Sequence, residues 1–173
     1  MKILPEIEID SDTKQLIQEL RNSCFPEHQV PRSYYKQLPH YRALEYHNDA
    51  LVGYMGLDYR VIKVGECVYS IIGVVDLCVS LEHQRKGIGS KMLDSVSSYV
   101  RGKDVDFIML VAEKSGFYTR HGFQQVTAYS SWLRLHEHKN YGIAFEQIDD
   151  LFVKPVNNKK WPAGHVDWLG YMF

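Results

Sequence analysis

The chain has 173 residues, which is enough for one domain with a real core and too few for two comfortable domains. We therefore expect a single domain over residues 1–173. Its 20 Lys and Arg residues nearly balance its 21 Asp and Glu residues, so the charge pattern indicates neither a basic nucleic-acid surface nor an acidic disordered tail. No nucleic-acid partner is expected.

The apolar stretches and cysteines point to a protein of the cytoplasm. Residues 1–6 lack the apolar core of a signal peptide, and the longest apolar-rich stretch, residues 68–75, is far too short to span a bilayer. Cys24, Cys67 and Cys78 are widely spaced and odd in number, which favours reduced thiols over a disulfide framework or a zinc site. We expect a cytoplasmic location, no membrane partner and no metal.

The first predicted elements are two helices followed by strands. Ser11 and Asp12 can cap an amphipathic helix that ends near residues 25–26. Residues 31–36 predict a second short helix, because proline stands at its start and again just after its end. Strands and a turn are then expected at residues 42–46, 47–49 (the turn) and 51–62.

The central part of the chain alternates strands and helices. Residues 68–79 are nearly continuous in apolar and β-branched residues, as in a strand that is buried on both faces, and they lead to a glycine-containing loop at 84–90. The elements expected after the loop are a helix from 92 to 100, a strand at 107–111, a short helix at 115–120, and strands at 125–135 and 151–156. Between 136 and 150 the pattern is weak. This order predicts an α/β (α+β) fold with a parallel strand pair at the centre of its sheet.

The loop after the buried strand has the features of a phosphate cradle. Gly87 and Gly89 let the backbone approach an anion, and the first N–H groups of the next helix point at it with the positive end of the helix dipole. Arg85 and Lys86 add positive charge. The glycine spacing fits neither a Walker loop nor the Rossmann fingerprint, so the loop predicts phosphate binding of another kind.

Two motifs resemble those of the GCN5-related N-acetyltransferase (GNAT) superfamily. Gln84, Gly87 and Gly89 are similar to its diphosphate-binding signature, in which Gln or Arg is followed after two residues by Gly, one residue, then Gly or Ala. Residues 116–123 match its signature of an aromatic residue, Tyr, three residues, Gly and Phe, and residues 76–79 look like its fourth strand. The resemblance implies the GNAT fold, in which helices flank a mixed sheet with a splayed parallel strand pair, and an acyltransferase with acetyl-CoA as co-substrate.

The resemblance also implies roles for individual residues. The strand end should bind the pantetheine arm of coenzyme A through backbone groups, and the loop should bind the pyrophosphate. The expected cofactor-binding residues are Leu77, Cys78, Val79, Gln84, Arg85, Lys86, Gly87, Ile88, Gly89 and Ser90. Tyr118 is expected to protonate the departing thiolate as general acid, and an N–H at Val79 or nearby to polarise the thioester carbonyl.

A general base is expected because an alkylammonium acceptor must lose a proton before it attacks. Many members of the superfamily carry Glu or His nine or eleven residues before the Gln position, where this chain has Val75 and Gly73. The nearest carboxylate, Asp76, faces the opposite side of a regular strand, so its role as base requires a bulge. Glu82 would act through a water relay. Asp76 and Glu82 are the two candidates.

Residues 149–153, followed by residues 166–173, look like the tail of aminoglycoside N-acetyltransferases that modify the 2-prime amine. If the resemblance extends to binding, Asp167, Trp168 and the carboxylate of Phe173 would hold a cationic amine by charge and aromatic contact. The alternative is a terminal strand whose large apolar residues cover the core.

The leading hypothesis is direct acetyl transfer from acetyl-CoA to the primary amine of a small molecule, such as an aminoglycoside-like polyamine. Acetylation of a peptide or protein amine and a non-catalytic acyl-CoA sensor are the alternatives. The absence of Glu or His at the two usual base positions favours the sensor, whereas Tyr118 favours an enzyme. The protein is expected to be a monomer or a homodimer.

Overall fold

The computed structural model describes residues 1–113 and 115–173. The chain forms two compact units, of which unit 1 contains Met1–Asp58 and Val74–Val96, and unit 2 contains Tyr59–Gly73 and Ser97–Phe173. Three elements supply residues to both units: β3 (Ala50–Val64), β4 (Cys67–Val79) and α2 (Ile88–Val100). That the two units make a single domain stays a prediction.

The strands form a mixed sheet, in which hydrogen-bonded neighbours follow the order β1-β2-β3-β4-β5-β7-β6-β8, and β3 also pairs with β8. The remaining strands are β1 (Lys2–Pro5), β2 (Tyr41–His47), β5 (Phe107–Val111), β6 (Gln124–His136), β7 (Lys139–Pro155) and β8 (Val166–Tyr171). β4 and β5 run parallel, with Ile71 opposite Phe107 and Gly73 opposite Met109. The predicted mixed sheet with a parallel pair is confirmed, and the splay of that pair stays a prediction.

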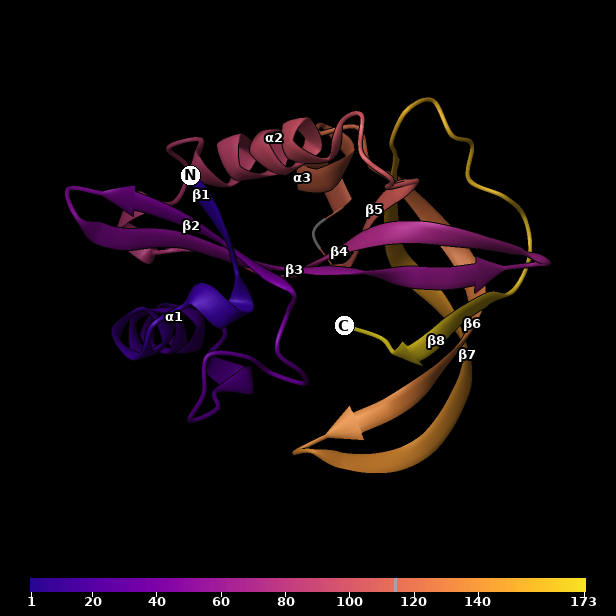
Figure 1. Ribbon diagram of the computed structural model, residues 1–173, viewed down its shortest axis with the longest axis horizontal. Helices are drawn as coiled ribbons and strands as arrows, with labels where there is room; N and C mark the ends of the chain where they lie inside the picture. Colours follow the sequence, from indigo (N-terminus) through magenta and orange to yellow (C-terminus); the bar gives the residue numbers. More distant parts are fainter. Residues whose placement is uncertain (114) are drawn as a thin grey trace. The chain divides into compact units, whose positions relative to one another are not determined.

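In unit 1 the strands lie between two helices, α1 (Ser11–Cys24) and the first turns of α2 (Figure 1). Because side chains alternate along a strand, successive residues of β3 face opposite helices. Tyr54 packs with Ile17 and Leu20 of α1 in one buried cluster. Gly53 faces α2, where a side-chain carbon would lie only 2.7 Å from Sδ of Met92. Gly53 therefore lets β3 lie close to α2 on one face of the strand, and Tyr54 packs against α1 on the other face.

Two local predictions for unit 1 are corrected by the structure. The cap of α1 is Asp10, whose carboxylate accepts the N–H of Thr13 at 2.7 Å, rather than Ser11 or Asp12. Residues 31–36 form bends and no helix, and a short 3-10 turn, η2 (Pro26–His28), precedes them. Tertiary contacts override the helical pattern here, because the fully buried guanidinium of Arg42 binds both the carbonyl and the hydroxyl of Ser33.

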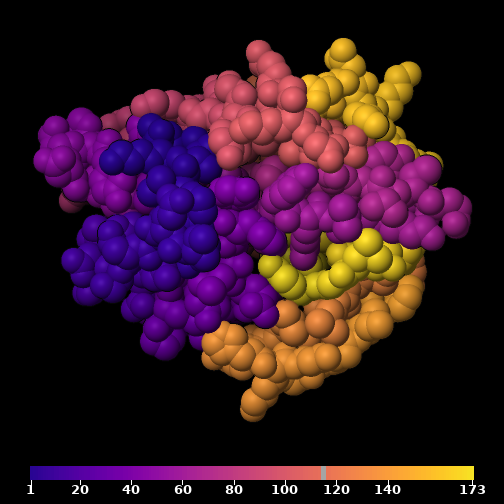
Figure 2. Space-filling model, in the orientation of Figure 1, coloured from indigo at the N-terminus to yellow at the C-terminus, as the bar shows by residue number. Residues whose placement is uncertain are grey.

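The core of unit 2 is built from buried residues of β3 to β8, among them Phe107, Leu151, Val166 and Trp168. β8 is paired with both β3 and β6, and Figure 2 shows its yellow residues between the magenta β3–β4 turn and the orange β6–β7 hairpin. β5 has the predicted bounds, whereas β7 starts at Lys139 instead of residue 151. The sequence pattern did not predict the early part of β7, because apolar residues of this part, such as Ile143 and Phe145, are exposed.

Among the described residues, no helix has both the length and the apolar character that crossing a bilayer requires.

Candidate active site

The end of β4 and the loop that follows are tied together through the carbonyl of Val79. This carbonyl accepts the side-chain amide of Gln84 at 3.0 Å and the thiol of Cys24 at 3.4 Å. A 3-10 turn, η3 (Leu81–His83), lies between strand and loop, and the amide of Ser80 donates to the carbonyl of Val52 at 2.9 Å. The side chain of Gln84 therefore ties the start of the loop to the end of β4.

The loop itself has the backbone conformation of an anion cradle. Arg85 and Gly87 both lie in the left-handed region, with φ of 62° and 79°. α2 begins directly afterwards, because the N–H of Lys91 donates to the carbonyl of Gly87 at 2.9 Å. The first N–H groups of a helix point out of its N-terminus, and the space where a side chain of Gly87 would stand meets no described atom within 4 Å. The exposed loop with Arg85 and Lys86 thus fits a diphosphate.

Replacing Gly87 with valine is expected to weaken coenzyme A binding at least about tenfold, since a β-branched residue resists the left-handed conformation and fills the open cradle. Calorimetric titration with coenzyme A measures the change. Gly102→Val is the matched control, because Gly102 also has a left-handed φ, 73°, and meets no described atom within 4 Å. Equal losses of affinity in both variants would show that the effect is strain and not the cradle.

The two candidate bases have different surroundings in unit 1. Asp76 lies within β4 with a φ of 52°, in the left-handed region. Its carboxylate accepts the Nε–H of Arg21 at 2.7 Å, and the Arg21 side chain is only 1% exposed. Glu82 is exposed in η3. The left-handed conformation of Asp76 therefore goes together with an ion pair between its carboxylate and Arg21 of α1.

Tyr118 belongs to unit 2 and lies in α3 (Ser115–Thr119). Its ring packs against Phe123 and Phe152, with ring centroids 6.0 and 5.5 Å away. The carbonyl of Tyr118 accepts the N–H groups of His121 and Phe123, and Gly122 makes this turn with a φ of 79°. Burial raises the pKa of Tyr118 above the ordinary value of a tyrosine, which already lies well above neutral pH.

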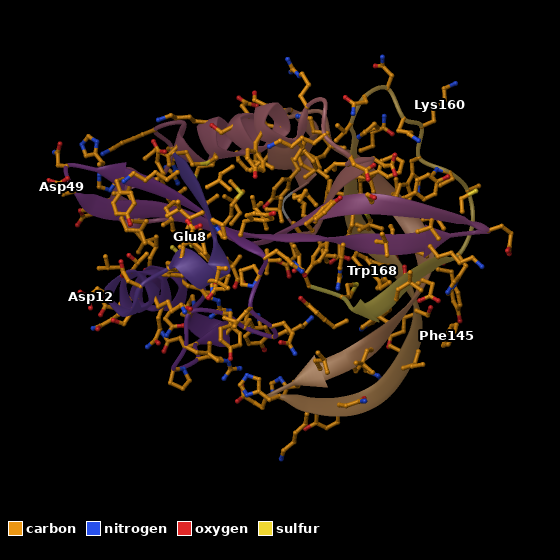
Figure 3. The ribbon with its side chains drawn as sticks, in the orientation of Figure 1. Glu8, Asp12, Asp49, Phe145, Lys160 and Trp168 are labelled. Atoms are coloured by element: carbon orange, nitrogen blue, oxygen red, sulfur yellow. The ribbon has the colours of Figure 1, made fainter. Side chains whose placement is uncertain are left out.

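The C-terminal residues of unit 2 pack around Arg60. The guanidinium of Arg60 lies 5.5, 4.7 and 5.1 Å from the rings of Trp168, Tyr171 and Phe173. Trp168 (labelled in Figure 3) is 0% exposed and belongs to the core of the unit. Asp167 accepts the N–H of Leu169 at 2.9 Å. These contacts fit the alternative reading of Trp168, a terminal strand that covers the core.

Phe173 lies directly on Gly73 of β4. A side-chain carbon at Gly73 would stand 2.1 Å from the ring of Phe173, far inside van der Waals contact. Gly73 is one of the two positions, with Val75, where the sequence resemblance leads us to expect Glu or His. Here the absence of a side chain makes room for an aromatic ring.

Replacing Gly73 with alanine is expected to destabilise the fold by about 1–3 kcal/mol, because overpacking must displace the ring of Phe173. Urea unfolding measures the change. Gly170→Ala is the control in the same unit, since a carbon there would meet its nearest described atom only at 3.9 Å. A Gly73→Ala variant as stable as Gly170→Ala would contradict the docking of Phe173.

The structure divides the predicted site residues between the units. Unit 1 holds all ten predicted cofactor residues together with both candidate bases, and unit 2 holds Tyr118 and the tail. The sequence interpretation missed Arg21 and Cys24, although both follow Ile17 at helical spacing and so mark the buried face of α1. In the ranges 1–113 and 115–173, no group of three or more His, Cys, Asp or Glu side chains could hold a metal ion.

The acetyltransferase (GNAT) domain family matches residues 8–126 of the chain. The chain belongs to this family. Membership confirms the predicted enzyme class, an N-acetyltransferase with acetyl-CoA as co-substrate. No curated protein matches the sequence at a significant level.

Solved structures of GNAT proteins share the fold at low identity. Eis1 from Mycobacterium abscessus is 14% identical with a TM-score of 0.63, covering 76% of this chain and 33% of Eis1. A GNAT family acetyltransferase from Brucella melitensis, solved with acetyl-CoA, is 14% identical with a TM-score of 0.61, covering 95% and 93%. The ribosomal-protein-S18-alanine N-acetyltransferase from Escherichia coli is 12% identical with a TM-score of 0.53, covering 92% and 99%. The chain thus spans about a third of Eis1 and nearly all of the other two.

Proposed function

We propose that the domain transfers the acetyl group of acetyl-CoA directly to the primary amine of a small molecule. The observation that carries this proposal is the loop of unit 1, in which Gln84 holds the carbonyl of Val79 and the left-handed Gly87 opens α2. A cradle of this kind suits the pyrophosphate of coenzyme A, and the family match covers the whole loop.

Within this proposal, each part of the chain has one role. Residues 77–79 bind the pantetheine arm through backbone groups, and residues 84–90 bind the pyrophosphate. A backbone N–H at or near Val79 polarises the thioester carbonyl while the amine attacks it. Tyr118 donates its proton to the departing thiolate, a role open to it because a tyrosine hydroxyl is protonated at neutral pH.

Removal of the proton from the acceptor amine needs a carboxylate or water. Asp76 is held by the buried Arg21, so we give it the structural role of joining β4 to α1. Glu82 is exposed two residues before Gln84 in the chain, and the proposal assigns the proton relay through water to this carboxylate. Glu82→Gln should then lower kcat more at pH 7 than at pH 9, where a larger fraction of the acceptor amine is already neutral.

The proposed acceptor is an aminoglycoside-like polyamine. This choice rests on the similarity of residues 166–173 to the tail of aminoglycoside 2-prime N-acetyltransferases. Asp167 and Phe173 are the tail residues that the proposal gives to the acceptor, whereas Trp168 stays in the core. Acetylation of a peptide or protein amine and the non-catalytic sensor are the competing functions.

The test is release of free coenzyme A thiol from acetyl-CoA by the purified protein, measured over a panel of aminoglycosides, polyamines, amino acids and short peptides. Turnover with the polyamines or aminoglycosides supports the proposal. Turnover with peptides alone establishes the protein-acetylating alternative. Coenzyme A binding without turnover on any amine would establish the sensor, and calorimetry in parallel separates that outcome from a failure to bind.

A further inference from the structure

Two cysteine thiols from distant parts of the chain lie together in unit 1. Cys24 is the last residue of α1, and Cys78 lies near the end of β4. Cys24 follows Ile17 and Leu20 on the apolar face of the helix, and these residues share one hydrophobic cluster with Cys78. The sulfur of Cys24 lies 3.4 Å from the carbonyl oxygen of Val79, the residue that follows Cys78 in β4. Packing of the helix on the sheet thus forms a dithiol that the sequence spacing does not suggest.

The two thiols have unequal surroundings. Cys24 is partly exposed, whereas Cys78 is 5% exposed. The neighbouring thiol of Cys78, helped by the hydroxyl of Ser23 that donates to the Cys24 sulfur, outweighs burial and lowers the pKa of Cys24 to about 7. The neighbouring thiol of Cys24, together with burial, raises the pKa of Cys78 well above its ordinary value. Cys24 therefore has the character of an attacking thiolate, and Cys78 that of a thiol that reacts second.

We propose that Cys24 and Cys78 are a reversible oxidation site. A low-molecular-weight disulfide takes two electrons from the two thiols and is itself reduced. The sulfur of Cys24 attacks one sulfur of the reagent, whose disulfide bond breaks and releases one thiol. The sulfur of Cys78 then attacks the sulfur of Cys24 and releases the second thiol. Both cysteine protons leave with the released thiols, so the reagent is reduced and one intramolecular disulfide forms.

Oxidation also changes the proposed cofactor strand, and this part rests on the proposed function. The thiol of Cys24 donates to the carbonyl of Val79, which also accepts from Gln84. A disulfide sulfur carries no proton, so oxidation removes this donor and pulls on the strand end at Cys78. The oxidised protein should bind acetyl-CoA at least about fivefold more weakly than the reduced protein, about 1 kcal/mol.

The reactivity of Cys24 should follow its thiolate. The rate of its alkylation by iodoacetamide should rise with pH and reach half of its plateau near pH 7, because the thiolate becomes the major form above that pH. Peptide mass spectrometry after short exposures gives the rate for each cysteine. A midpoint for Cys24 at about 8.5, the value of a free cysteine, would contradict an activated thiol.

The oxidation test treats the folded, purified protein with glutathione disulfide, quenches with acid and alkylating reagent, and maps all three cysteines by mass spectrometry. We expect a Cys24–Cys78 disulfide that dithiothreitol reverses, with an intact mass lower by two hydrogen atoms. The Cys67→Ser variant is the control, because Cys67 is exposed and outside the pair, and it should behave the same. Cys78→Ser should stop at a mixed disulfide on Cys24.

The outcomes separate the oxidation site from the proposed function. Free thiols at both Cys24 and Cys78 while Cys67 is modified would overturn the proposal, whatever the protein does with acetyl-CoA. A disulfide that leaves acetyl-CoA affinity unchanged would overturn the coupling to the cofactor strand. A reduced protein that does not bind acetyl-CoA would contradict the proposed function and leave the thiol result standing.

Discussion

Replacing Tyr118 with phenylalanine is expected to lower kcat at least about 100-fold while leaving acetyl-CoA affinity nearly unchanged. The substitution removes one hydroxyl and keeps the ring that packs against Phe123 and Phe152. Without this proton donor, coenzyme A must leave as the free thiolate. The expected loss therefore lies in kcat and not in binding.

Thiol release gives kcat for this variant, and calorimetry gives its affinity for acetyl-CoA. Tyr141→Phe is the control, since Tyr141 is exposed in β7 and also loses only a hydroxyl. Unchanged kcat in Tyr118→Phe would remove this residue as the acid. A large loss of acetyl-CoA affinity would show instead that the hydroxyl serves in binding.

Replacing Asp76 with asparagine is expected to lower the free energy of unfolding by about 3 kcal/mol, since it leaves the charge of Arg21 buried without its counterion. Asparagine tolerates the left-handed conformation about as well as aspartate, so the substitution tests charge and not strain. The ion pair is short, 2.7 Å, and its side chains are 1% and 15% exposed. Urea unfolding measures the loss.

The control for Asp76→Asn is Glu66→Gln in unit 2. Glu66 pairs with Lys63 at 3.4 Å, but its side chain is 95% exposed, and such surface pairs contribute little to stability. We expect no measurable change from Glu66→Gln. If Asp76→Asn is equally neutral, the ion pair does not hold α1 to β4, and Asp76 becomes available again as the base.

Local signals in the sequence were sufficient for the central elements. Apolar runs bounded by turn residues predicted β4 and β5, because burial at these places follows from neighbouring residues, whereas α2 begins at Ile88, four residues before its predicted start. The bends at 31–36 and the early part of β7 were not predictable in this way. In the first, the buried Arg42 determines the path, and in the second the strand exposes its apolar residues.

The candidate site likewise has one part that the sequence predicted and another that depends on how distant segments pack. Gln84, Gly87 and Gly89 predicted the cradle, because phosphate binding depends on local backbone geometry, and its role in binding stays a prediction. The partner of Asp76 was not, since Arg21 is far away in the sequence and only the packing of α1 brings it close. Nor could the sequence show that Gly73 makes room for Phe173, which depends on where the C-terminal residues fold.

Calorimetric titration of the purified protein with acetyl-CoA, alongside the Gly87→Val variant, tests the central claim most directly. The account predicts one binding site per chain and an affinity that falls at least about tenfold in the variant while Gly102→Val keeps it. No binding to the wild-type protein, or equal affinities for all three proteins, would contradict the assignment of residues 84–90 as the acetyl-CoA cradle.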